Sequence, residues 1–121
     1  MAFDPLDWIG VADSLATGTD EAPLRTAIGR YYYAVFLKSR LSLAHDGKFT
    51  PTGRGSDHSG VSRALKMHRA SAGTAMENLG RLRERADYEP TASISPREIA
   101  AAKEWAEEVT RMCSGDWERL P

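Results

Sequence analysis

The sequence predicts an all-α protein, an antiparallel up-and-down bundle of four main helices plus a short N-terminal helix. Apolar residues recur at three- and four-residue spacing through long segments, and no segment alternates apolar and polar residues as a strand would. Gly, Pro and Ser mark the breaks between these segments. With 121 residues and one cysteine, the chain is expected to fold as a single domain over residues 1–121, without an internal disulfide.

The first two predicted helices cover residues 5–16 and about 20–44. Asp4 is suited to cap the first helix, and Pro5 fits its first position, where a missing N–H costs nothing. Apolar spacing predicts which residues of the two helices face inward. In the first they are Leu6, Ile9 and Leu15, and in the second Leu24, Ile28, either Tyr31 or Tyr32, Val35 and Phe36.

A mobile loop is predicted over residues 46–56, which are rich in Gly, Pro, Thr and Ser. A third helix is expected to begin at about His58. Its inward residues are Val61, Leu65 and either Met67 or His68. Residues 70–73 are predicted to separate it from a fourth helix, which Pro90 ends because proline cannot continue the helical hydrogen bonding.

The last helix has the clearest beginning. Ser95 can cap it, Pro96 fits the first position, and Glu98 completes a capping box. Its predicted inward residues are Ile99, Ala102, Ala106, Val109 and Cys113. A lone cysteine on such a face is expected to act as a small apolar residue without chemistry of its own.

The overall charge argues against a broad nucleic-acid surface, because 16 basic residues face 17 acidic ones. The distribution is uneven: residues 58–85 hold six Lys and Arg against two acids, and residues 86–121 hold four against eight. This asymmetry indicates either a confined anion-binding surface or two solvated helix faces of opposite sign. No signal-like or membrane-spanning segment is recognised, so a cytoplasmic location without membrane attachment is expected.

Three arginines lie in residues 79–89, at the end of the fourth predicted helix. Arg83 lies about 40° from the inward Leu79, since each residue turns the helix by about 100°. A guanidinium at the edge of the buried face needs a partner, either Asp87 one turn later or a bound phosphate. Arg81 and Arg85 are expected to point away from the core.

The segment Tyr31–Tyr33 places three aromatic rings around the second helix, so the three cannot all be buried. Either one is core, one boundary and one exposed, or a tyrosine and Arg30 line a site with the Arg83 helix.

His58 is open to two interpretations, helix capping or contact with a phosphate or base. The three histidines lack metal-ligand spacing, so no metal and no cofactor are expected.

These segments resemble the HEPN superfamily, in particular its small stand-alone prokaryotic members. The family's second helix carries an arginine, two tyrosines, an alanine and a phenylalanine, and it is followed by a His-Ser-Gly-Val-like helix start and an Arg-x-x-x-Asp-Tyr segment. The matching residues are Arg30, Tyr32, Tyr33, Ala34, Phe36, His58 to Val61, Arg83, Asp87 and Tyr88. The resemblance covers residues 24–109.

The resemblance implies a helical bundle that forms a homodimer and acts in toxin–antitoxin or defence systems. Many relatives are metal-independent endoribonucleases marked by an arginine, about four to six residues and then a histidine. Tyr88 stands five residues after Arg83, where that histidine is expected. A tyrosine, whose hydroxyl titrates near pH 10, is a poor general base at neutral pH, so the sequence leaves binding without cleavage as an alternative.

Three functions are compatible with the sequence. In the first, the protein binds RNA or a nucleotide and either cleaves RNA or only binds it. Candidate catalytic residues are Arg83, Tyr88 and His58, and candidate binding residues are Arg30, Tyr32, Arg85 and Asp87. In the second, a non-catalytic module pairs with a nucleotidyltransferase-type antitoxin that modifies Tyr88. In the third, the arginines form structural ion pairs with the acidic last helix.

Overall fold

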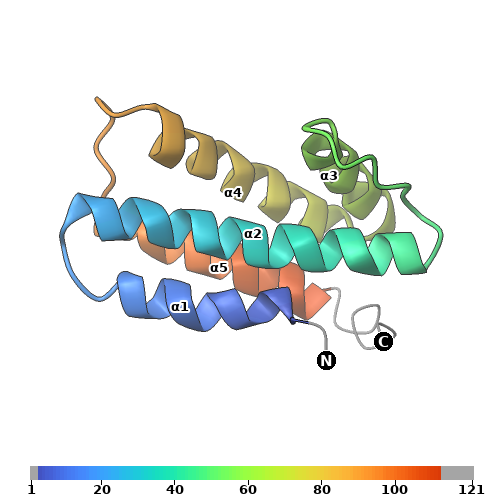
Figure 1. The fold of residues 1–121 in the computed structure, drawn as a ribbon, viewed down its shortest axis with the longest axis horizontal. Helices are drawn as coiled ribbons and strands as arrows, with labels where there is room; N and C mark the ends of the chain where they lie inside the picture. The colour runs from blue at the N-terminus through green and yellow to red at the C-terminus, as the bar shows by residue number, and fades with distance from the viewer. Residues whose placement is uncertain (1–2, 113–121) are drawn as a thin grey trace.

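The computed structural model describes residues 3–112 and confirms the predicted all-α class (Figure 1). A 3₁₀ turn, η1 (Pro5–Asp7), leads into α1 (Trp8–Leu15), followed by α2 (Glu21–His45), α3 (Asp57–His68), α4 (Ala70–Tyr88) and α5 (Pro96–Met112). Helices α1, α2, α4 and α5 run alternately in opposite directions, and the shorter α3 packs beside α4 at one end of the bundle. No described helix is both long and apolar enough to cross a membrane.

The predicted helix starts are confirmed by their capping hydrogen bonds. The Asp4 carboxylate accepts from the Leu6 amide at 3.0 Å, ahead of Pro5 at the first position. At the start of α5, the Ser95 amide donates to Glu98 Oε1 at 3.0 Å and the Glu98 amide donates to Ser95 Oγ at 3.3 Å. These reciprocal bonds form the predicted capping box.

The core lies between the four antiparallel helices and uses the predicted inward faces. Its members include Ile28, Val35, Met76, Leu79, Ile99, Ala102, Ala106 and Val109, all below a tenth exposed. Tyr31 and Tyr32 are both buried, where the spacing had left one or the other. The Tyr31 hydroxyl donates to Asp13 Oδ1 at 2.5 Å, which satisfies its polar end within the core.

The predicted boundary between α3 and α4 is wrong. Residues 70–73 belong to α4, and only Arg69 separates the two helices. Gly73 is needed because α4 passes close to α3: a Cβ built on it would lie 2.6 Å from the backbone of Lys66. Of the two residues left open at the end of the inward face of α3, Met67 is 86% exposed, since it lies about 200° around the helix from the buried Leu65, whereas His68 is partly buried. The prediction for Cys113 lies outside the described residues.

The end of α4 is held by Arg25 of α2, a contact that the sequence did not indicate. Its guanidinium donates to the carbonyls of Ala86 at 2.8 Å and Glu89 at 3.1 Å, and also to that of Ala92. Carbonyls at a helix C-terminus lack intrahelical partners, and a cation there also favours the helix dipole. Arg25 thereby fixes the segment that carries Arg83.

Candidate functional site

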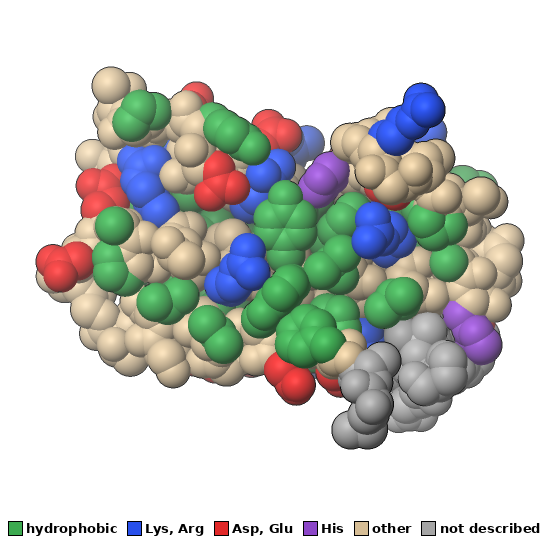
Figure 2. Space-filling model, viewed as in Figure 1, with side chains coloured by type: hydrophobic (Ala, Val, Ile, Leu, Met, Phe, Trp, Pro, Cys, Tyr) green, Lys and Arg blue, Asp and Glu red, His purple; other side chains and the backbone are tan. Residues whose placement is uncertain are grey.

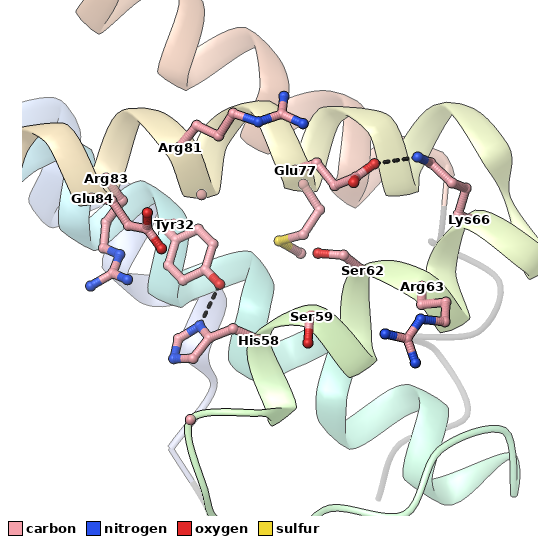
Figure 3. A pocket seen from close by; sticks show the side chains of 13 residues that line it. Tyr32, His58, Ser59, Ser62, Arg63, Lys66, Glu77, Arg81, Arg83 and Glu84 are labelled. Carbon is pink, nitrogen blue, oxygen red and sulfur yellow. Dashed lines mark hydrogen bonds and ion pairs between the residues drawn. The ribbon is translucent and has the colours of Figure 1, made fainter.

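A pocket of about 630 Å³ opens between α3 and α4, above the middle of α2 (Figure 3). Three residues singled out from the sequence line it: Tyr32 from α2, His58 from the first turn of α3, and Arg83 from α4. They are far apart in the chain and are brought together only by packing of the helices. Gly80 of α4 faces the Tyr32 ring of α2, and a Cβ built on Gly80 would lie 3.3 Å from that ring.

His58 is fixed by a hydrogen bond and by stacking. Its Nδ1 lies 2.5 Å from the Tyr32 hydroxyl, and its ring stacks on Phe36 with centroids 4.4 Å apart. Burial, followed by the positive charges of Arg83 and Arg40, lowers the pKa of His58 below its ordinary value of 6.5. The imidazole is therefore neutral at neutral pH, and a neutral imidazole can donate or accept a proton.

Tyr32 is the partner that orients this imidazole. Burial raises the pKa of Tyr32 well above its ordinary value, although the nearby Arg83 charge opposes the rise. The hydroxyl is therefore protonated, and it can share the short hydrogen bond with His58 in either direction. In both cases the remaining imidazole nitrogen, Nε2, is left for a ligand.

Asp57 fixes the start of α3 and so the position of His58. Its buried carboxylate accepts from the Thr52 hydroxyl at 2.6 Å, from the Thr52 amide at 3.1 Å and from the Gly53 amide at 3.0 Å, and it pairs with Arg40 at 3.5 Å. The Thr52 hydrogen bonds are the main reason that the pKa of Asp57 is lowered. Asp57 is thus the residue that anchors the preceding loop to the start of α3.

Arg83 lies at the edge of the core, as the sequence predicted, with 8% of its surface exposed. Its guanidinium donates to Asp87 Oδ2 at 3.3 Å and to the Tyr33 hydroxyl at 3.5 Å, which confirms the pairing with Asp87. The guanidinium also lies 5.3 Å from the Tyr32 ring and 5.6 Å from the Tyr88 ring. Its Nε is buried and has no hydrogen-bond partner among residues 3–112.

Tyr88 and Asp87 stand beside Arg83 but outside the pocket. The Tyr88 side chain is 71% exposed at the last position of α4. It does not lie among the residues that line the pocket with His58. The structure thus brings His58, rather than Tyr88, to the side of the pocket that Arg83 occupies.

Two predicted binding residues point elsewhere. Arg85 forms an ion pair with Glu98 of α5 and donates to the Ser93 carbonyl at 3.0 Å, so it ties α4 to α5. Arg30 lies over the Trp8 ring at 4.5 Å and does not line the pocket. Both guanidiniums contact residues outside their own helix, and the spacing of residues along one helix does not predict such contacts.

The other residues of the pocket were not predicted as site residues from the sequence. The pocket's remaining charged lining residues are Arg63, Lys66, Glu77, Arg81 and Glu84. The excess of Lys and Arg over residues 58–85 indicated a positively charged surface, but it did not indicate which of these residues would lie on the same surface. Within residues 3–112, no group of three or more His, Cys, Asp or Glu side chains is placed to hold a metal ion.

Comparison with known proteins adds no relative. No family model matches the chain, and no curated protein or solved structure is significantly similar to it.

Proposed function

We propose that this protein is an RNA-binding protein of the HEPN type, with the phosphate group held by Arg83 beside His58. The observation that carries the proposal is the meeting of Tyr32, His58 and Arg83 in one pocket. A guanidinium matches the geometry of phosphate oxygens, and Arg83 lines the pocket. Its terminal nitrogens would bind a phosphate there, because the Nε is closed to solvent.

The proposal includes metal-independent cleavage of RNA. The 2′-oxygen of the ribose attacks phosphorus, the bond to the 5′-oxygen breaks, and a 2′,3′-cyclic phosphate and a 5′-hydroxyl result. The neutral His58 imidazole takes the proton of the 2′-hydroxyl, and the imidazolium so formed returns it to the leaving 5′-oxygen, while Arg83 balances the charge that develops on the phosphate. His58 would thus supply the imidazole that the resemblance places at Tyr88.

The test is incubation of single-stranded RNA with the protein in EDTA. The His58→Asn variant should lose cleavage by about 10²-fold or more, the range expected for a general acid or base, and should keep RNA binding. Arg83→Gln should lose both activities. Arg97→Gln is the matched control, since Arg97 is an exposed arginine of α5 outside the pocket. Intact RNA with the wild-type protein would exclude cleavage, and absence of binding would exclude the whole proposal.

The proposed active form is a homodimer that uses the apolar face of α2 and α1. Figure 2 shows hydrophobic side chains gathered over these two helices. Tyr33, Leu37 and Leu41 follow one another at four-residue spacing, and Leu41 is 50% exposed. This ridge continues from the site, because Tyr33 also contacts Arg83. Leu41→Glu should convert the dimer to a monomer in sedimentation analysis, and a wild-type monomer would contradict the assignment.

A second function is favoured by the exposure of Tyr88. Its hydroxyl is accessible at the end of α4, next to the Arg83 guanidinium, which can attract the phosphates of a nucleotide. In this alternative, a nucleotidyltransferase-type partner attaches a nucleotide to Tyr88. Intact mass of the protein co-expressed with the neighbouring gene product should show the added nucleotide, and Tyr88→Phe should abolish it. Unmodified wild-type protein would exclude this function.

A further inference from the structure

The pocket extends well beyond Arg83 and His58, as a groove along α3 and α4. Its α3 wall carries Ser59, Ser62, Arg63 and Lys66, and its α4 wall carries Glu77, Gly80, Arg81 and Glu84. From His58 to Lys66 the helix rises by about 12 Å, at about 1.5 Å per residue. This length exceeds what a single phosphate needs, so the groove has room for a chain.

The two arginines that line this groove beyond Arg83 form no ion pair with any described residue. Arg63 is exposed and makes no hydrogen bond or ion pair within residues 3–112, and Arg81 donates only to the neutral Asn78 side chain, at 3.0 Å. Figure 3 shows them on opposite walls, with the Ser62 hydroxyl pointing into the space between. Ser62 likewise has no partner among the described residues. The groove therefore offers cationic and hydroxyl donors that the fold does not use.

The carboxylates of the groove do not cancel this charge. Glu77 pairs with Lys66 across the helices, and this ion pair, with the Arg81 charge, keeps the pKa of Glu77 below its ordinary value. The pair joins α3 to α4 and closes the far end of the groove (Figure 3). Among the described residues, Glu84, exposed at the near end, is the one remaining acid of the lining, against Arg63, Arg81 and Arg83.

We infer that the α3–α4 groove is a second phosphate subsite, in which Arg63 and Arg81 bind the backbone of the nucleotides next to the one held by Arg83. The inference rests on the proposed function and specifies its ligand. The ligand is a single-stranded RNA segment with at least two internucleotide phosphates, and a mononucleotide fills only part of the site. Single strands suit such a groove because their backbone can follow a narrow positive channel.

The test uses fluorescein-labelled 2′-O-methyl oligouridylates, which resist cleavage because they lack a free 2′-hydroxyl. Anisotropy at several salt concentrations gives the dissociation constant and its salt dependence. With three phosphate contacts, the slope of log K against log salt should be about −2 for the wild type, since each contact on a single strand contributes about −0.7. Affinity should rise from the dimer to the tetramer and then level off.

The Arg63→Gln/Arg81→Gln variant should bind about tenfold more weakly for each guanidinium removed, with a slope near −0.7. It should also lose the gain from dimer to tetramer, while Arg97→Gln should behave as the wild type. Both arginines lie on the surface or the rim, so the double variant should fold, which circular dichroism checks.

The outcomes separate this inference from the proposed function. If the double variant binds as the wild type while Arg83→Gln loses binding, the groove is not a subsite and the proposed function stands. If the wild type binds no oligonucleotide at all, both are overturned. A dimer that binds as tightly as the tetramer would also overturn the subsite.

Discussion

The separation of α3 and α4 depends on Gly73, and Gly73→Ala is the sharpest test of how the pocket is built. A Cβ at this position would lie 2.6 Å from three atoms of Lys66, its backbone N, its Cα and its Cβ. Atoms on or next to the backbone cannot rotate away as the end of a flexible side chain can. The substitution must therefore push α3 away from α4.

The expected cost follows from the distance. Carbon atoms in favourable contact lie about 3.5–4.0 Å apart, so α3 has to move by about 1 Å. Overpacking of this kind costs about 1–3 kcal/mol, and alanine regains about 0.5–1 kcal/mol over glycine within a helix. The net expectation is a loss of about 0–2.5 kcal/mol, centred near 1 kcal/mol, which corresponds to about 4 °C in the unfolding midpoint for a domain of this size.

The assay is urea unfolding followed by circular dichroism, with Gly10→Ala as the matched control. Gly10 also lies within a helix, but nothing comes within 4 Å of a Cβ built there, so its alanine variant should be stabilised by about 0.5–1 kcal/mol. Oligonucleotide affinity should fall in Gly73→Ala and stay constant in Gly10→Ala. Equal stability of the two variants would refute the close packing of α3 on α4.

Three further predictions concern the site. Arg83→Gln should raise the pKa of His58 toward 6.5 in a proton NMR titration, because one of the charges that oppose its protonation is removed and burial remains; an unchanged pKa would contradict the electrostatic coupling. Tyr32→Phe should lower cleavage about tenfold with little effect on RNA binding, since the imidazole loses the hydroxyl that orients it; full activity would exclude that role. Because the pKa of Asp57 is lowered in the fold, its charge stabilises the protein above the unfolded value of about 3.9, and this stability is lost as the pH falls through the folded pKa. Asp57→Asn should therefore be less stable than the wild type at neutral pH, with a difference in unfolding free energy that shrinks below about pH 4; a difference independent of pH would contradict this.

The fold was predictable from the apolar spacing of its helices and from boundary signals at the first and last of them. Asp4 with Pro5 and Ser95 with Glu98 are local hydrogen-bond patterns, and the structure uses them as predicted. The boundary at 70–73 was wrong for an equally physical reason. Gly73 is small because another helix passes beside it, and sequence alone does not distinguish such a glycine from one that ends a helix.

The site was predictable only in part. Arg83 and its Asp87 partner follow from helical periodicity, which fixes one residue against the core and another one turn away. Arg85 was expected to point away from the core but pairs with Glu98, and Arg30 lies over the Trp8 ring. These partners belong to other helices, so tertiary packing decides which residue each arginine contacts.

The resemblance implies a histidine at position 88, on the same helix as Arg83, whereas the proposed mechanism uses His58 of α3. A histidine on the same helix as Arg83 would hold its distance to the phosphate through local geometry alone. His58 instead comes from α3, and its position depends on the Asp57 anchor, on the Tyr32 hydroxyl and on the docking of α3 against α4 at Gly73. Cleavage by such a site should therefore be lost with substitutions that loosen α3, while RNA binding through Arg83 should be weakened but not abolished, a separation of the two activities that a same-helix histidine would not produce.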